Sequence, residues 1–292
     1  MAKTLEEGFQ TFLGRLAPLM LEHNKAASHK DSVESCLEKN FDCYRMFETG
    51  SFGNGTGVRH YSDTDYFAVC KTGKLKQNSS STLREVKEAL QNTFWQTSGI
   101  EVDTPAVRIP FGSYASETLE VTPCDYRGMV DTPVGNMPYY DIADGVGGWM
   151  NASPSAHTGY VKEQDERLDG KLKPLIQLVK AWKFYNSVPI SSFYLELRTT
   201  KYAEGESSII YDIDLTRLFG SLDDNGLPAV RDPMGVSGMI SACSSDAKRT
   251  TALSKISTAR SRAVKAHAAR EDKVDDAFYW WNLFFSDKFP SR

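Results

Sequence analysis

The strongest constraint on the fold of this chain is a change of sequence pattern part-way along it. Short runs rich in β-branched and aromatic residues, of the length of strands, lie between residues 44 and 126. From residue 174 onward, apolar residues recur at spacings of three and four, which is typical of amphipathic helices. The length of 292 residues agrees with two lobes. The sequence therefore predicts an α+β fold, with a lobe of mixed sheet and helices at residues 1–160 and a helical lobe at residues 161–292.

The expected elements follow the same periodicities. In the first lobe we expect helices at 4–22, 31–39 and 81–94 and strands at 44–47, 64–69, 106–111 and 117–126. Asp31 and Glu34 have the spacing of a capping box at the start of the second helix. Residues 50–55 are too glycine-rich for a regular element, and the Gly, Pro and Asn content of 127–160 predicts a long connecting segment. In the second lobe we expect helices at 174–182, 192–202, 245–270 and 273–285.

Composition excludes several classes of protein. A net charge of −4 argues against a dedicated duplex-DNA binder and against stable nucleic-acid binding. The basic residues at 245–270 are interpreted as a solvated helix face, with a partner or nucleic-acid surface as the alternative. The five cysteines contain no Cys-x-x-Cys pair and the histidines lack ligand spacing, so neither a zinc site nor a disulfide framework is expected. The chain has no signal-peptide pattern and no apolar stretch of about 18 residues, so we expect a cytoplasmic protein without membrane contact.

Two aspartates stand at the opening of the predicted strand at 64–69. Because side chains alternate across a strand, Asp63 and Asp65 project from one face, and their carboxylates repel unless a cation lies between them. A cation that prefers hard oxygen ligands, most often Mg²⁺, meets that need. A third carboxylate would complete a two-metal site, and Glu120 is the candidate, with Asp125 as a rival on the opposite face of the same strand. An isolated Asp-x-Asp is more often a solvated strand start or turn.

A glycine-rich loop precedes these aspartates. Gly50 and Ser51 open the loop, whose exposed backbone N–H groups and serine hydroxyl suit the β- or γ-phosphate of a nucleotide. A single Gly-Ser pair is more often a flexible turn. The combination of a Gly-Ser pair, a glycine-rich loop and an Asp-x-Asp at a strand is more specific than its parts, and it predicts a site for phosphate and metal.

Together, this Gly-Ser pair, the Asp-x-Asp and the later strand acid resemble the signature of the polymerase-β-like nucleotidyltransferase superfamily. Within it, residues 49–56 and 61–67 are most similar to bacterial CD-NTases, the cGAS/DncV-like synthases of cyclic oligonucleotide signals in CBASS anti-phage defence, and closest to the CdnG clade. The resemblance covers nearly the whole chain. It implies a polymerase-β-like nucleotidyltransferase lobe, a C-terminal helical lobe and an active site in the cleft between them.

The resemblance also implies roles for the acidic residues and for the loop. It places Asp63 and Asp65 on both of two Mg²⁺ ions, for which Mn²⁺ can substitute, and Glu120 on the ion that activates the attacking hydroxyl. Many relatives carry aspartate as the third acid, so Glu120 departs from the commonest pattern. Gly50 and Ser51 are assigned to phosphate binding.

In the second lobe, the resemblance implies a nucleotide-binding face. Lys180 matches the lysine that reaches the donor triphosphate, Ser192 matches a phosphate-binding serine, and Phe193 matches an aromatic residue stacked on the donor base. A compact lysine charge suits phosphate, and a base stacked on an aromatic ring gains roughly 1–3 kcal/mol. Without the resemblance, the same three residues would be interpreted as a solvated lysine, a helix N-cap and a core phenylalanine.

The expected activity is that of an Mg²⁺-dependent nucleotidyltransferase that joins nucleoside triphosphates and cyclises the product. The resemblance favours a cyclic dinucleotide of the cGAMP type made from ATP and GTP, which activates an effector protein of the same defence system. Two alternatives stay open: a linear nucleotidyltransferase acting on RNA or protein, and a non-catalytic nucleotide or RNA sensor. Intact acids at positions 63, 65 and 120 argue against the sensor.

Overall fold

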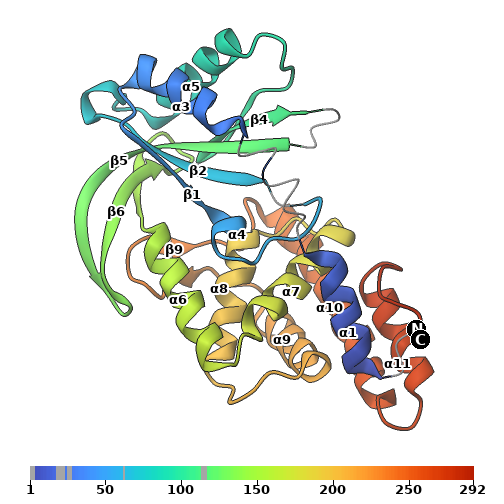
Figure 1. Cartoon of the computed structure of the whole chain (residues 1–292). Helices are drawn as coiled ribbons and strands as arrows, with labels where there is room; N and C mark the ends of the chain where they lie inside the picture. Colours follow the sequence, from blue (N-terminus) through green and yellow to red (C-terminus); the bar gives the residue numbers. More distant parts are fainter. Residues whose placement is uncertain (1–3, 18–23, 25–27, 62, 113–116) are drawn as a thin grey trace. The chain divides into compact units, whose positions relative to one another are not determined.

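The computed structural model describes residues 4–17, 24, 28–61, 63–112 and 117–292. The chain divides into two compact units (Figure 1). The first, here called the sheet unit, comprises residues 18–159 and 234–238, and the second, the helical unit, comprises residues 1–17, 160–233 and 239–292. The α+β class expected from the sequence is confirmed. The two units meet in the chain at residue 160, but the first 17 residues belong to the helical unit and not to the sheet.

The sheet unit is built on a mixed sheet whose main path runs β1-β2-β5-β4-β3. These strands are β1 (Arg45–Thr49), β2 (Thr64–Val69), β5 (Glu117–Thr132), β4 (Ala106–Phe111) and β3 (Glu101–Asp103). Strands β2 and β5 are parallel, and the remaining neighbours on this path are antiparallel. The far half of β5 pairs with β6 (Gly135–Ala143), which pairs in turn with β7 (Trp149–Ala152).

The two faces of β2 have different neighbours. Helices α3 (Lys30–Phe41) and α5 (Ser79–Thr93) cover one face (Figure 1), and Tyr66 and Ala68 point into the core that they share with the sheet. Phe67 and Val69 belong to a separate apolar cluster on the opposite face. Because side chains alternate along a strand, Asp65 lies on the face away from α3 and α5.

Several local expectations for the sheet unit are wrong. The second helix begins at Lys30 after His29, which makes no side-chain cap bond, so Asp31 and Glu34 form no capping box. Residues 50–53, expected as irregular loop, form the short helix α4 (Gly50–Gly53). The segment 127–160 is not a connection: it holds the end of β5, then β6 and β7, because a long hairpin satisfies its backbone groups by cross-strand pairing.

The helical unit contains α7 (Leu172–Tyr185), α8 (Ser192–Ala203), α9 (Tyr211–Asn225), α10 (Asp246–Ala269), α11 (Val274–Phe284) and the short pair β8 (Val230–Arg231) and β9 (Met239–Ile240). The helix α6 (Pro154–Arg167) leads into it from the sheet unit. Helices α6 and α9 were not predicted, whereas α8, α10 and α11 lie within two residues of their expected positions. No helix within the described ranges is long and apolar enough to cross a membrane.

A cluster of aromatic rings explains why the N-terminal helix α1 (Leu5–Leu16) belongs to the helical unit. Phe9 lies 5.2 Å from Trp281 between ring centroids, and Phe12 lies 4.6 Å from Phe285. All four side chains are buried, and aromatic groups of this size dominate the energetics of a core. Helix α1 begins with a capping box between Thr4 and Glu7 and ends at Leu16, so the remainder of the helix expected at 4–22, including Met20, lies largely outside the described residues.

Candidate active site

The pairing of β2 with β5 brings two of the predicted acids together. In this parallel pair Asp65 is the register partner of Glu120, so the two side chains project from the same face of adjacent strands, about 4.8 Å apart at the backbone. Asp63 stands one residue before β2 begins and two residues before Asp65. The sheet therefore gathers the three predicted carboxylates at one end of β2.

Asp125, the rival for the third position, lies elsewhere along β5. It is the register partner of Asp141 in the β5–β6 hairpin. Its carboxylate accepts a hydrogen bond from the Thr72 hydroxyl at 3.0 Å and forms an ion pair with Arg127 at 3.4 Å. The parallel register thus favours Glu120 as the neighbour of the paired aspartates.

The Gly-Ser turn lies directly against one of these carboxylates. Thr49, the last residue of β1, is the register partner of Asp65, and Gly50 follows it with a φ of +66°. A Cβ added to Gly50 would lie 1.8 Å from Asp65 Oδ2, so a larger residue would both strain the backbone and displace the carboxylate. A glycine at position 50 is therefore required by this close approach.

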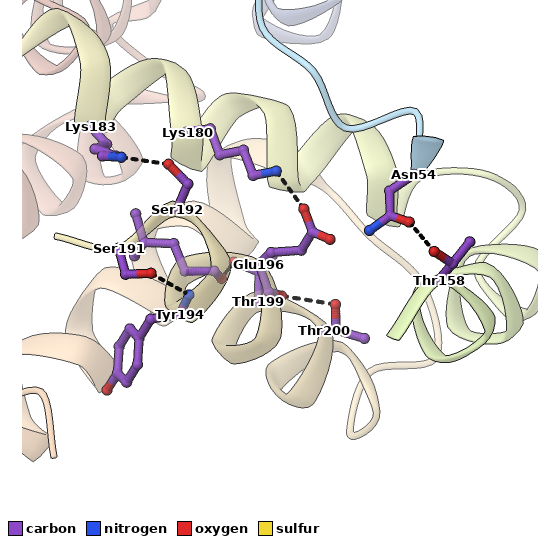
Figure 2. Close-up of polar contacts among 11 residues, drawn as sticks. Asn54, Thr158, Lys180, Lys183, Ser191, Ser192, Tyr194, Glu196, Thr199 and Thr200 are labelled. Carbon is purple, nitrogen blue, oxygen red and sulfur yellow. Dashed lines mark hydrogen bonds and ion pairs between the residues drawn. The ribbon is translucent and has the colours of Figure 1, made fainter. Parts of the chain in front are cut away.

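Hydrogen bonds hold the turn that carries Ser51. Within α4 and its end, the Asn54 amide donates to the Gly50 carbonyl at 3.1 Å and the Thr56 amide donates to the Ser51 carbonyl at 2.9 Å. The Thr158 hydroxyl donates to Asn54 Oδ1, a contact drawn in Figure 2. Ser51 therefore lies on a short helical turn that these hydrogen bonds stabilise, next to the carboxylates. The residue is half-buried.

Burial and mutual repulsion perturb the acids. Desolvation raises the pKa of Glu120 to about 8, and the negative charges of Asp65, Asp63 and Asp103 add to the rise, whereas Arg108 opposes it. Desolvation also raises the pKa of Asp63, against the opposing effects of Arg108 and of a hydrogen bond with Glu120. At neutral pH a proton on Glu120 therefore relieves the repulsion, which is the task that a cation performs in a metal site.

The chemistry of this donor set fits Mg²⁺, a hard cation that takes carboxylate oxygens. The observation that supports the fit is the crowding at Glu120, whose pKa is raised by burial and by the negative charges of Asp65 and Asp63. Within the part of the chain that the structure describes, no three His, Cys, Asp or Glu side chains already converge closely enough to form a metal cluster. Asp63, Asp65 and Glu120 are thus neighbours with the right chemistry rather than a preformed set of three ligands.

The three residues predicted in the second lobe lie on α7 and α8 of the helical unit, and Figure 2 shows Lys180 and Ser192. Lys180 is 3% exposed and forms an ion pair with Glu196, which is also buried. Ser192, the first residue of α8, accepts a hydrogen bond from Lys183 rather than from Lys180. Phe193 follows it with 39% of its surface exposed. The structure therefore places Ser192 and Phe193 at the start of α8 and buries Lys180 on α7, one turn before Lys183.

Sequence reasoning missed three charged residues around these sites. Arg108 on β4 is the register partner of Glu120 and the main positive charge near the acids. Alternation along the strand at 106–111 could have indicated the face on which Arg108 lies, but not that this strand pairs with β5. Lys183 and Glu196 complete the pairs with Ser192 and Lys180. Lys183 lies three residues after Lys180, and Glu196 lies four residues after Ser192. These spacings were the available signal, because residues three or four apart share a helix face.

A cavity of about 340 Å³ lies elsewhere in the helical unit. Its walls come from residues 227–229 and 241–246 and from Arg249. None of the predicted site residues lines it, so its location adds nothing to their assignment.

Comparison with known proteins agrees with the geometry. Residues 3–165 match the model of the Second Messenger Oligonucleotide or Dinucleotide Synthetase domain. The chain is 28% identical to the cyclic AMP-AMP-AMP synthase of an Acinetobacter strain, over 98% of this chain and 86% of that protein.

Solved structures share the fold. The CdnC protein of Escherichia coli MS115-1, solved with ATP, superposes with a TM-score of 0.75 at 16% identity, covering 98% of both chains. The Bradyrhizobium diazoefficiens CD-NTase CdnG, solved with GTP, superposes with a TM-score of 0.68 at 12% identity, again covering 98% of both chains. The chain belongs to the Second Messenger Oligonucleotide or Dinucleotide Synthetase family and is a nucleotidyltransferase, and it shares its fold with the solved CD-NTases.

Proposed function

We propose that this cyclic oligonucleotide synthase forms phosphodiester bonds at a site for two Mg²⁺ ions held by Asp63, Asp65 and Glu120. The observation that carries the proposal is the register of β2 with β5, which makes Asp65 and Glu120 neighbours with Asp63 two residues away. The raised pKa of Glu120 supports it, because burial and the negative charges of Asp65 and Asp63 together cause the rise. Mn²⁺, another hard cation, would substitute for Mg²⁺.

The chain's own residues have distinct tasks in this proposal. Asp63 and Asp65 supply carboxylate oxygens, and Glu120 gives up its proton when it becomes a ligand. Gly50 lets the turn lie against Asp65, and Ser51 next to it presents a hydroxyl and an amide to a phosphate of the substrate. When bound, the two metal ions supply the charge that activates the acceptor hydroxyl and neutralises the leaving pyrophosphate.

We assign metal chemistry to the sheet unit and nucleotide binding to the helical unit. Ser192 at the start of α8 would bind a phosphate, and the exposed ring of Phe193 offers a surface on which a base can stack. A lysine of α7 would complete the binding of the triphosphate. Lys180 is the position that matches the family pattern, although its burial with Glu196 leaves Lys183 nearer to the start of α8.

The product we propose is a cyclic dinucleotide of the cGAMP type, made from ATP and GTP. The similarity to the Acinetobacter cyclic AMP-AMP-AMP synthase, which extends over 98% of this chain, favours a second candidate, a cyclic triadenylate made from ATP alone. In either case the product would act as a second messenger for an effector protein in anti-phage defence.

The product of the purified full chain with all four nucleoside triphosphates and Mg²⁺, identified by mass spectrometry and by nuclease digestion of its linkages, tests this proposal. A phosphatase-resistant cyclic product containing AMP and GMP would support the first candidate, and one containing AMP alone would support the second. A phosphatase-sensitive chain would indicate a linear transferase. Nucleotide binding without release of pyrophosphate would indicate a sensor and would refute the proposal.

A further inference from the structure

The turn that carries Ser51 is too short and too rich in glycine to keep its conformation alone. Its helix α4 spans only Gly50–Gly53, and Gly55 follows two residues later. A single helical turn fixes several backbone angles in return for few hydrogen bonds, and glycine loses more conformational freedom on folding than any other residue. Contacts with other parts of the protein are therefore needed to stabilise this turn.

Asn54 ends the turn and connects it to a helix that is distant in the sequence. Its amide donates to the Gly50 carbonyl at 3.1 Å, and its side-chain oxygen accepts a hydrogen bond of 2.5 Å from the hydroxyl of Thr158 on α6 (Figure 2). Asn54 is buried and Thr158 is half-buried, and a hydrogen bond shielded from water is stronger than one at the surface. Asn54 therefore stabilises the turn through its main chain and joins it to α6 through its side chain.

The part of α6 that carries Thr158 is held by contacts with the β5–β6 hairpin on both sides of that residue. Ser153, directly before the helix, donates its hydroxyl to the Pro138 carbonyl of β6 at 2.7 Å. Gly159, directly after Thr158, lies so close to the hairpin that an added Cβ would be 3.1 Å from Val134 Cγ2. The hairpin therefore fixes the position from which the Thr158 hydroxyl reaches the turn.

The same hairpin continues the strand that carries Glu120. Strand β5 pairs with β2 at Glu120 and with β6 further along. Contacts therefore run from the acids along β5 to the hairpin, from the hairpin to α6, and through Thr158 and Asn54 back to the turn beside Asp65. All of these residues belong to the sheet unit. The position of Ser51 relative to the carboxylates is thus set from two sides, by the end of β1 and by α6.

We infer that Thr158 is a positioning residue for the reaction: acting through Asn54, it holds the Ser51 turn in the conformation that binds a substrate phosphate next to the carboxylates. This inference rests on the proposed function for the role of Ser51. When a protein is only fractionally in its binding conformation, its apparent affinity falls by that fraction. Loss of the Thr158 hydroxyl therefore weakens phosphate binding although Thr158 does not contact the ligand.

Binding of an ATP analogue with a methylene group between the α- and β-phosphates, measured by calorimetry on the full chain with Mg²⁺, tests the inference. Thr158→Val keeps the branched shape of the side chain and removes the hydroxyl, so it should weaken binding about 3- to 10-fold, the effect of one neutral hydrogen bond. Thr158→Ser keeps the hydroxyl and should restore binding to within about twofold of the parent value. Binding by Thr158→Val within that same limit would overturn the inference.

Thr216→Val is the matched control. The hydroxyl of Thr216, which is also half-buried on a helix, donates to the Asp212 carbonyl at 2.7 Å within α9. This variant loses a similar hydrogen bond away from the turn, and it should change analogue binding less than about twofold. An equal loss of binding in Thr216→Val and Thr158→Val would indicate a general effect on stability and would contradict a positioning role.

A double-mutant cycle tests whether Thr158 acts through Asn54. Asn54→Ala should weaken analogue binding by itself, because it removes the acceptor of the Thr158 hydroxyl. Addition of Thr158→Val to Asn54→Ala should then weaken binding by less than about a further twofold, since both substitutions remove the same contact. Fully additive losses would show that Thr158 acts by another route, which contradicts the inference.

Hydrogen exchange of residues 50–56, followed by mass spectrometry without ligand, tests the same step independently of binding. The Thr56 amide donates to the Ser51 carbonyl at 2.9 Å and is protected while the turn is formed. Exchange in this segment should be about 3- to 10-fold faster in Thr158→Val and unchanged in Thr216→Val. Equal exchange in the parent and in Thr158→Val would refute the positioning role.

The two proposals fail in different ways. If Thr158→Val speeds exchange and weakens analogue binding but the parent forms no cyclic product from any nucleotide, the proposed function fails and the positioning role stands. If cyclic product forms and Thr158→Val leaves exchange and analogue binding at the parent values, the positioning role fails alone.

Discussion

The sheet unit and the helical unit position their polar side chains by different means. On β2 and β5, Asp65 and Glu120 are fixed by strand register, and a slip of one residue would turn every side chain to the other face. On α7, Lys180 and Lys183 are three residues apart and share a helix face, so helical spacing alone does not separate their roles. The separation comes from α8, which offers Glu196 to one lysine and Ser192 to the other.

This comparison shows where a pattern match between sequences is informative. A strand motif such as Asp-x-Asp specifies the face of each carboxylate, so the motif nearly determines the geometry. A helical motif with two lysines specifies a face but not the partner of each lysine. Four variants test this difference, from the largest expected effect to the smallest.

Replacement of Asp63 and Asp65 by asparagine together should have the largest effect, on activity. Loss of both charges removes the negative site that binds the metal ions, and the rate of pyrophosphate release from ATP and GTP should fall at least about a thousandfold. The folded state should persist, because neither residue belongs to the buried core and both lie at a region of excess negative charge. Pyrophosphate release at an appreciable fraction of the parent rate would show that these aspartates are not the metal ligands.

Lys180→Met should have the largest effect on stability. It leaves Glu196 buried without its ion-pair partner, and removing one member of such a pair costs about 3–5 kcal/mol in the free energy of unfolding, measured with urea. The matched control is Lys180→Met combined with Glu196→Leu, which removes both charges and should recover most of the loss. A single variant as stable as the parent would mean that Lys180 is not structural.

Gly50→Ala should have an intermediate effect. The positive φ and the approach of 1.8 Å to Asp65 Oδ2 predict a loss of about 1–3 kcal/mol in the free energy of unfolding, with reduced synthesis of product. Gly53→Ala on the same short helix is the control, since its added Cβ would meet only the Glu48 carbonyl at 3.7 Å. Equal behaviour of the two variants would contradict the role given to the close approach.

The smallest effect expected is on the pH dependence of stability. The pKa of Lys183 is lowered from its ordinary value to about 8 in the folded protein, so above that pH the unfolded chain binds more protons than the folded one. The contribution of Lys183 to the free energy of unfolding therefore rises as pH increases from about 8 to 10. The parent should gain stability over this range relative to Lys183→Met, as measured by urea denaturation at each pH. A constant difference between the two proteins would indicate an unperturbed lysine.

The fold was predictable where local pattern decides and was mispredicted where partners distant in sequence decide. The bounds of strand β2 and of helices α8 and α10 were predicted to within one residue, because alternation and apolar spacing are local signals. The sequence predicts a connection over 127–160 because its glycines and prolines are turn signals, whereas cross-strand pairing of the end of β5 with β6 makes this segment an extension of the sheet. Helix α4 was mispredicted because only its first glycine needs an unusual backbone angle.

By itself the sequence determined the α+β class, the acids at 63, 65 and 120, the serine turn before them and the family resemblance. Those features depend on residue identity and on spacing within single elements. Tertiary structure decided that Glu120 and not Asp125 lies beside Asp65, that Gly50 touches that carboxylate, and that Lys180 is buried against Glu196 while Lys183 binds Ser192. These outcomes depend on which elements become neighbours, and contacts between elements far apart in the chain carry no local sequence signal.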